Sequence, residues 1–126
     1  MQPTIMIVDD DEQILVLVEI LLRRQGYHVL KAATPYNALK ILDDTIPDLC
    51  LLDYMMPGMN GLELCEQIRQ HPSAGKVPVV MLSAVDTDEF INNSLAAGAN
   101  GHISKAEMHR RLTQEVNQYL PVTQAK

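Results

Sequence analysis

The sequence predicts an α/β fold, in which helices cover both faces of a parallel β-sheet. Short runs rich in Val, Ile and Leu alternate with longer segments of helical periodicity along the chain. The first, third and fifth of these runs end next to charged residues, Asp9, Asp53 and Lys105. Because the carboxyl ends of parallel strands meet at one edge of a sheet, we expect these charges to converge on one crevice. Several carboxylates and one ammonium suit a divalent metal and a phosphoryl group.

Local signals place strands and helices in strict alternation. The expected strands are residues 4–8, 27–32, 49–52, 77–82 and 101–104. The expected helices are residues 11–25, 34–44, 61–71, 87–97 and 106–119. The strand segments are short apolar runs bounded by turn residues, whereas the helical segments repeat apolar positions every three or four residues.

The ends of these elements carry recognisable boundary residues. Gly26 and Gly98 close the first and fourth helices, because glycine adopts the left-handed conformation that commonly follows a helix. Thr34 and Pro35 open the second helix as its N-cap and its first-turn proline. Pro47 then separates that helix from the third strand.

Length and charge indicate a single domain that works with a protein partner. We expect the domain to occupy residues 1–120, followed by a polar tail or linker remnant at residues 121–126. The chain has 16 acidic and 10 basic residues, a net charge of -6, and its Lys and Arg residues are scattered. This pattern argues against direct nucleic-acid binding.

The cysteine and hydropathy patterns favour a cytoplasmic protein. Cys50 lies in an apolar strand and Cys65 on a helix face, so we interpret both as reduced core thiols. The longest unbroken apolar run, residues 14–18, is too short to cross a bilayer. The amino terminus has no basic segment followed by a long apolar stretch, so we expect no targeting or membrane segment.

Four motifs occur in an order and spacing that identify a family. They are residues 7–10 (Ile-Val-Asp-Asp), residues 53–61 (Asp-Tyr-Met-Met-Pro-Gly-Met-Asn-Gly), residues 82–84 (Leu-Ser-Ala) and Lys105. With them, the chain resembles the CheY-like response regulator receiver domains of two-component signalling over essentially its full length. The resemblance implies a flavodoxin-like, doubly wound fold, with a five-stranded parallel sheet of order 2-1-3-4-5 flanked by five helices.

The resemblance also implies a phosphorylation site that depends on Mg²⁺. Asp53 is then the phosphoacceptor, and Mg²⁺ is held by Asp10, Asp53 and the backbone carbonyl of Met55, with Asp9 acting mainly through water. Two like charges about 4 Å apart repel by roughly 4 kcal/mol at an effective dielectric near 20, so clustered carboxylates need such a counter-charge. The phosphoryl donor is a phosphohistidine or a small acyl phosphate. The domain is therefore expected to be a signalling module, not an enzyme, that promotes its own phosphorylation and dephosphorylation.

Three further residues are implied in binding the phosphoryl group and in switching. The ammonium of Lys105 neutralises the phosphoryl oxygens, while the hydroxyl of Ser83 and the amide of Ala84 hydrogen-bond to them. The family usually has an aromatic residue three positions before the lysine and a proline after it, whereas this chain has His102 and Ala106. Ala106 makes a cis bond after Lys105 improbable, since such bonds cost about 2.5 to 4 kcal/mol. The sequence from residue 104 to residue 107 has capping-box spacing, which would start the last helix earlier, but this competes with the strand role expected for Ser104.

Partner surfaces and signal lifetime follow from the same resemblance. Gln13, Val16 and Ile20 lie on the side of the first helix opposite its apolar stripe of Ile14, Leu15, Val18, Leu21 and Leu22. We expect a sensor histidine kinase or a histidine phosphotransfer protein to dock there. The face made by the fourth helix, fifth strand and fifth helix is expected to bind a downstream protein effector or a second copy. Met55 and Val85, which flank the path of an attacking water, cannot orient it, so self-dephosphorylation should be slow.

Other classes of protein also fit parts of the sequence. A haloacid-dehalogenase-like phosphatase would use an Asp-x-Asp motif after the first strand, which residues 9–11 superficially allow, but it would leave the motif at Asp53 unexplained. A flavodoxin-like electron carrier needs a hydroxyl- and glycine-rich phosphate loop where this chain has three carboxylates. A phosphate-independent interaction module is a third alternative, and His102 is its only hint.

Overall fold

The computed structural model describes residues 2–120 and confirms the predicted α/β fold. Its five strands are all parallel and lie in the order β2-β1-β3-β4-β5. They are β1 Thr4–Val8, β2 His28–Ala32, β3 Leu49–Asp53, β4 Val79–Ser83 and β5 Gly101–Ser104. The chain adds β2 on one side of β1 and then β3, β4 and β5 on the other side. The strand order therefore reverses between β1 and β3, which are hydrogen-bonded neighbours.

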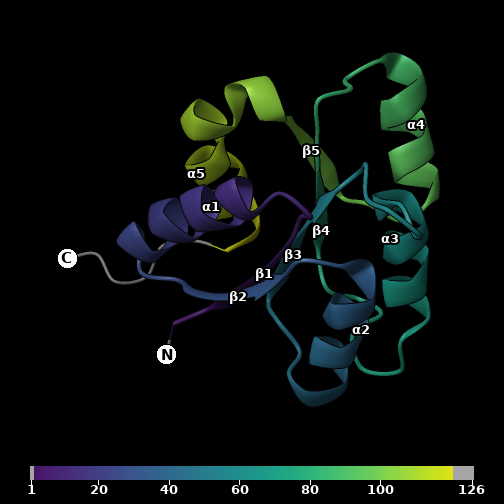
Figure 1. Ribbon diagram of the computed structural model, residues 1–126, viewed down its shortest axis with the longest axis horizontal. Coiled ribbons are helices and arrows are strands. Elements are labelled where there is room, and N and C mark those ends of the chain that lie inside the picture. The colour runs from purple at the N-terminus through teal and green to yellow at the C-terminus, as the bar shows by residue number, and fades with distance from the viewer. Residues whose placement is uncertain (1, 121–126) are drawn as a thin grey trace.

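Five α-helices cover the sheet in two layers (Figure 1). They are α1 Glu12–Arg24, α2 Pro35–Asp44, α3 Gly61–Gln70, α4 Asp88–Ala96 and α5 Met108–Tyr119. Helices α1 and α5 lie on one face, and α2, α3 and α4 lie on the other (Figure 1). A short 3₁₀ turn, η1 Lys105–Glu107, joins β5 to α5.

The three central strands, β1, β3 and β4, each contribute to two apolar cores, which is why these segments are continuously apolar. In β1, Ile5 and Ile7 pack in the core beneath α1 and α5, while Met6 and Val8 pack in the core beneath α2 and α3. All four of these side chains are fully buried. With both faces packed, the sheet holds the carboxyl ends of its strands in fixed positions.

Two boundaries differ from the sequence prediction in a way that concerns the site. Asp53 is the last residue of β3 and pairs with Leu82, so it is inside the sheet and not after it. Strand β4 begins at Val79 because Pro78 lacks an amide hydrogen, and it runs on to Ser83. Both polar side chains are therefore anchored in strands.

Of the two roles open to Ser104, the structure has the strand role and not the capping box. Ser104 stays in β5, where it pairs with Ser83, and its side chain makes no capping hydrogen bond. The chain turns through η1 at Lys105, and α5 begins only at Met108. Strand pairing therefore outweighs the local capping signal at this position. Residues 2–120 contain no cis peptide bond.

Two smaller expectations concern the core and the membrane. Cys50 and Cys65 are both buried and unpaired, as expected of core thiols. Within residues 2–120, no helix is both long and apolar enough to cross a membrane. The tail expected at residues 121–126 lies outside the described residues.

Candidate functional site

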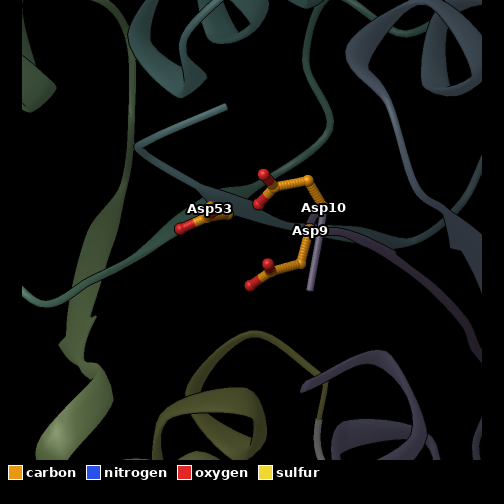
Figure 2. A group of neighbouring side chains, drawn as sticks. All are labelled: Asp9, Asp10 and Asp53. Atoms are coloured by element: carbon orange, nitrogen blue, oxygen red, sulfur yellow. The ribbon is translucent and has the colours of Figure 1, made fainter. Parts of the chain in front are cut away.

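Three carboxylates meet where β1 and β3 end. Asp9 and Asp10 directly follow β1, and Asp53 ends the neighbouring strand β3. One oxygen atom from each of the three side chains lies within 4.8 Å of the other two. Figure 2 shows the three side chains extending from two adjacent strands into one space. The predicted convergence of these charges is therefore present in the structure.

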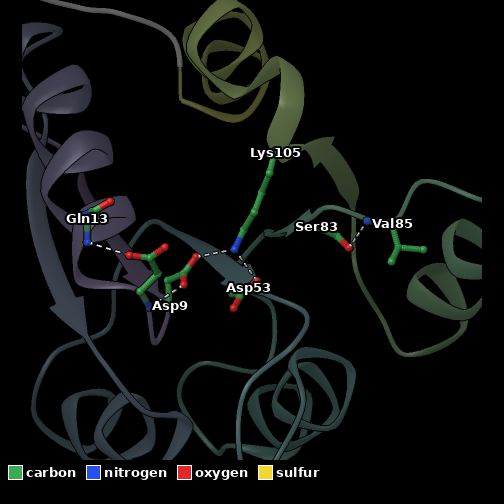
Figure 3. A network of polar contacts seen from close by, with 7 residues as sticks. Asp9, Gln13, Asp53, Ser83, Val85 and Lys105 are labelled. Atoms are coloured by element: carbon green, nitrogen blue, oxygen red, sulfur yellow. Dashed lines mark hydrogen bonds and ion pairs between the residues drawn. The ribbon is translucent and has the colours of Figure 1, made fainter.

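Lys105 completes the charge cluster from the edge of the sheet. It follows β5, and its Nζ lies 2.8 Å from Asp53 Oδ1 and 3.0 Å from Asp9 Oδ2. Figure 3 shows the ammonium between these two carboxylates. The contact with Asp9 was not predicted from the sequence, because it depends on how far and in which direction the lysine side chain extends.

Burial makes the negative charge of the cluster costly. Asp9 is fully buried and Asp53 is 3% exposed, whereas Asp10 is exposed. Burial raises the pKa of Asp53 to about 6; the hydrogen bond from Lys105 opposes this rise and the nearby carboxylate of Asp9 adds to it. Burial acts to lower the pKa of Lys105, but its close contacts with the carboxylates of Asp53 and Asp9 outweigh burial, so its pKa is raised. Because one ammonium faces three carboxylates, the cluster has more negative than positive groups.

The residues of this cluster fit a hard divalent cation. Asp9 Oδ1 accepts a hydrogen bond of 2.9 Å from the amide of Asp11. Among the described residues, the buried Asp9 Oδ2 accepts no hydrogen bond, and its close contact is the ion pair with Lys105. A cation shared by Asp9, Asp10 and Asp53 would supply the missing positive charge. Carboxylate oxygens are the ligands that Mg²⁺ prefers in proteins.

The loop after β3 is held closely against the site. The amide of Tyr54 donates to the carbonyl of Leu82 at 3.1 Å, and the amide of Gly61 donates to the carbonyl of Tyr54 at 2.8 Å. A Cβ atom on residue 61 would collide with the carbonyl of Asp53, so only glycine fits there. Met55, whose carbonyl is an expected metal ligand, lies in this loop and is 67% exposed.

Ser83 lies on the opposite side of Asp53 from Asp9 (Figure 3). It ends β4 and is buried, and its Oγ accepts a hydrogen bond of 2.8 Å from the amide of Val85. A hydroxyl that accepts one hydrogen bond still has its own hydrogen to donate. Ala84 and Val85 follow in an exposed loop.

The proposed docking residues line a shallow groove on α1. Val16 and Ile20 are 48% and 45% exposed, and Gln13 is exposed beside them. The groove has a volume of about 410 Å³, and its lining residues are Glu12, Gln13, Val16, Leu17 and Ile20. On the opposite side of α1, Leu15, Val18 and Leu22 are buried, while Ile14 and Leu21 are only partly buried. Leu17, which is 38% exposed, is a groove residue that the sequence analysis did not identify.

His102, the expected switch residue, lies in the middle of β5. It pairs with Met81 and is half-buried. Among the described residues it makes no hydrogen bond or ion pair, so no polar contact links its side chain to Ser83 or to Asp53.

Comparison with known proteins gives a consistent family assignment. A family model described as the response regulator receiver domain matches residues 5–117. The transcriptional regulatory protein AfsQ1 of Streptomyces coelicolor is 33% identical over 118 residues, which cover 94% of this chain and 51% of that protein. The chain thus spans about half the length of the curated relatives that it matches.

Solved structures share the fold over nearly the whole chain. The chemotaxis protein CheY4 of Vibrio cholerae has a TM-score of 0.91 and 27% identity, covering 95% of this chain and 100% of that one. The receiver domain of sensor histidine kinase PA1611 from Pseudomonas aeruginosa has a TM-score of 0.85 and 24% identity, covering 94% and 98% of the two chains. That structure contains a magnesium ion coordinated in its active site cleft.

Replacing Asp53 by Asn should stabilise the metal-free protein at neutral pH. The folded state raises the pKa of Asp53 from 3.8 to about 6, so it binds the proton more tightly than the unfolded state does. This contribution to stability is present below the unfolded pKa and is lost as the pH rises through about 6. Asn has no charge to bury, so in EDTA at pH 7.5 the thermal midpoint of Asp53→Asn should exceed that of the wild type.

The control is Asp44→Asn, which removes an exposed carboxylate from the end of α2. It should change the midpoint little at any pH. The advantage of Asp53→Asn should shrink as the pH falls toward 4, where the wild-type carboxyl is protonated. A midpoint for Asp53→Asn that lies below the wild type at every pH would contradict the proposed cost of the buried charge.

Proposed function

The chain belongs to the family of response regulator receiver domains, and we propose that it accepts a phosphoryl group on Asp53. Receiver domains are signalling domains of two-component systems, and the family binds Mg²⁺ at an acidic pocket. One observation carries the proposal for this chain. Asp53 is the buried carboxylate that lies within 4.8 Å of two others and also contacts Lys105 at 2.8 Å.

The proposed reaction transfers a phosphoryl group from a phosphohistidine to Asp53. A carboxylate oxygen of Asp53 forms the new bond to phosphorus in line with the breaking bond to the imidazole nitrogen, and the imidazole leaves. The ammonium of Lys105, 2.8 Å from Asp53 Oδ1, is positioned to neutralise a phosphoryl oxygen. The hydroxyl of Ser83 and the amide of Ala84 are proposed to donate hydrogen bonds to the other oxygens.

We propose that Asp10, Asp53 and the carbonyl of Met55 hold Mg²⁺, and that Asp9 acts on it through water. Mg²⁺ would supply the positive charge that one ammonium cannot provide to three carboxylates and a phosphoryl group. Asp9 is suited to an indirect role because it is engaged by Lys105 and by the amide of Asp11. The chain is proposed in this way to promote both its phosphorylation and its dephosphorylation.

The proposed phosphodonor is a sensor histidine kinase or a histidine phosphotransfer protein that docks on the α1 groove. The exposed apolar side chains of Val16, Leu17 and Ile20 support this surface, because they lie on α1, the helix that follows Asp9 and Asp10.

We assign residues 1–120 to the receiver domain. A downstream protein effector, or a second copy, is proposed to bind the face of α4, β5 and α5. We propose that the chain meets these partners in the cytoplasm and that it does not contact nucleic acid directly.

The alternative functions have no support in the comparisons. An aspartate-nucleophile phosphatase would react through Asp9, and it would leave the motif that begins at Asp53 without a role. A phosphate-independent module would not need the acidic cluster and the lysine together. A phosphoacceptor needs both.

Acetyl phosphate with Mg²⁺ should add one phosphoryl group to the wild-type domain and none to Asp53→Asn. Asn cannot form the acyl phosphate because it has no carboxylate oxygen. Intact-mass measurement after mixing gives the labelled fraction directly. Equal labelling of Asp53→Asn and wild type would refute Asp53 as the acceptor.

Changing the α1 groove should block the protein phosphodonor selectively. Val16→Glu with Ile20→Lys places charges where the groove is apolar, so transfer from a phosphorylated histidine partner should fall at least tenfold, about 1.4 kcal/mol. Labelling by acetyl phosphate should stay at the wild-type level. The matched control is Ile46→Glu with Leu95→Lys, which alters exposed apolar residues elsewhere. Partner transfer at the wild-type rate in the α1 variant would show that this groove is not the docking surface.

Loss of the phosphoryl group should be slow in the wild type. Met55 and Val85 are 67% and 37% exposed beside the site, and neither side chain can hold a water in line with phosphorus. Met55→Asn with Val85→Glu should therefore shorten the lifetime of the phosphoryl group, by about tenfold or more. The decay is followed by intact mass in excess Mg²⁺ after acetyl phosphate is removed. If both proteins lose the group at the same rate, these side chains do not control access of water.

A further inference from the structure

The loop between β3 and α3 is tied by hydrogen bonds at its two ends but not at its tip. At the β3 end, the amide and the carbonyl of Tyr54 are both hydrogen-bonded. At the α3 end, Asn60 and Glu63 form a reciprocal capping box. Among the described residues, by contrast, no hydrogen bond joins Pro57 or Gly58 to another element. The tip of the loop therefore depends on packing for its position.

A tyrosine from α2 packs on this tip. A Cβ atom on residue 58 would lie 2.9 Å from the Oη atom of Tyr36 and 3.4 Å from its Cε2 atom. The phenol ring thus lies against the backbone of Gly58, on the side where any other residue would carry its side chain. Gly58 also has a φ of 85°, a conformation that favours glycine. Both the backbone conformation and the tyrosine therefore call for glycine at this position.

The start of α2 fixes the position of Tyr36. Thr34 caps the helix by accepting a hydrogen bond of 3.0 Å from the amide of Asn37, and Pro35 lies in the first turn. Tyr36 follows in the same turn, and it is 55% exposed. Within residues 2–120, its hydroxyl makes no hydrogen bond. The contact between Tyr36 and the loop is therefore one of packing.

The position of this loop matters because the loop carries a proposed metal ligand. Met55, three residues before Gly58, offers the backbone carbonyl that is proposed to bind Mg²⁺. Mg²⁺ demands a nearly ideal octahedral geometry, so each of its ligands must be held in place. A loop that moves freely would have to be ordered when the ion binds, and the entropy lost would weaken binding. A side chain that supports the loop can therefore raise the affinity for the metal without touching it.

Resting on the proposed Mg²⁺ site, we propose that Tyr36 is a positioning residue for metal binding. Its ring holds the tip of the β3–α3 loop in the metal-free protein, so the carbonyl of Met55 is in place before the ion arrives. Tyr36 acts through Gly58 and not by contact with the ion. Its effect is on the affinity of the site for Mg²⁺ and, when Mg²⁺ is limiting, on the phosphorylation of Asp53.

Titrations with Mg²⁺ test the proposal directly. The dissociation constant is taken from the amide chemical shifts of Asp10 and Asp53 in ¹⁵N-labelled protein. Tyr36→Ala should weaken binding by about tenfold, the smaller of the losses typical when support for a metal ligand is removed. Tyr36→Phe should bind Mg²⁺ as the wild type does, because it keeps the ring. The matched control is Leu95→Ala on α4, which removes a side chain of a residue that is also 55% exposed and should leave the affinity unchanged.

Hydrogen exchange in EDTA separates ordering of the loop from general stability. The amide of Met59 bonds within the loop and that of Gly61 bonds across it, to the carbonyls of Pro57 and Tyr54. Both amides should exchange faster in Tyr36→Ala than in the wild type, while the amides of α5 keep their wild-type rates. Equally faster exchange in α5 would show that the substitution destabilises the whole domain, and it would overturn the inference.

A double variant tests whether Tyr36 acts through Gly58. Gly58→Ala should also weaken Mg²⁺ binding, because the added Cβ atom displaces the ring and strains the backbone. Since both changes break the same contact, the loss in the double variant should be smaller than the product of the two single losses. Single losses that multiply in full would show that the two residues act independently.

The remaining outcomes are equally decisive. Equal Mg²⁺ affinity in Tyr36→Ala and in the wild type would overturn the inference. A loss in Tyr36→Phe or in Leu95→Ala as large as that in Tyr36→Ala would do the same. A wild type that binds no Mg²⁺ would refute the proposed metal site instead.

Discussion

The ion pairs that Lys105 makes with Asp9 and Asp53 are the interaction on which the rest of the site depends. Both carboxylates are buried, and isolated buried charges of this kind are costly. The ammonium offsets part of this cost, yet it faces three carboxylates whose oxygens lie within 4.8 Å of one another. The site is therefore short of positive charge, and both a metal ion and the loss of charge on Asp53 would relieve it.

The fold creates this charge imbalance by fixing the backbone. Both faces of the sheet are packed, so the carboxyl ends of β1 and β3 cannot separate to relieve the repulsion. The wall formed by Tyr54 and Gly61 is tied to β4 and to Asp53 itself. The opposite wall differs, because Ser83 leads into the exposed residues 84–87. A phosphoryl group on Asp53 would thus meet one rigid wall and one that can move, and this asymmetry is what a switch requires.

Much of this arrangement could be predicted from the sequence, because it depends on the pattern of whole segments. The alternation of strands and helices, with charged residues at the ends of three strands, was enough to predict that four charged side chains meet at one edge of the sheet. They are Asp9, Asp10, Asp53 and Lys105. The tertiary contacts of single side chains could not be predicted in this way. Three such contacts are the ion pair of Lys105 with Asp9, the exposure of Leu17 and the tilted ring contact of Tyr54 with Phe90. They depend on side-chain reach and on the packing of distant elements. The capping signal at Ser104 was misleading for the same reason, since pairing with Ser83 kept this residue in β5.

The central claim is that the acyl phosphate forms on Asp53 and not on Asp9 or Asp10. Borohydride reduces an acyl phosphate to an alcohol and so converts the modified aspartate to homoserine, which marks its position permanently. After labelling with acetyl phosphate and Mg²⁺, reduction and trypsin digestion, residues 41–69 form one peptide and residues 1–23 another. Mass-spectrometric sequencing should find homoserine at position 53 of the first peptide. Homoserine at position 9 or 10 of the second, with Asp53 unmodified, would contradict the account.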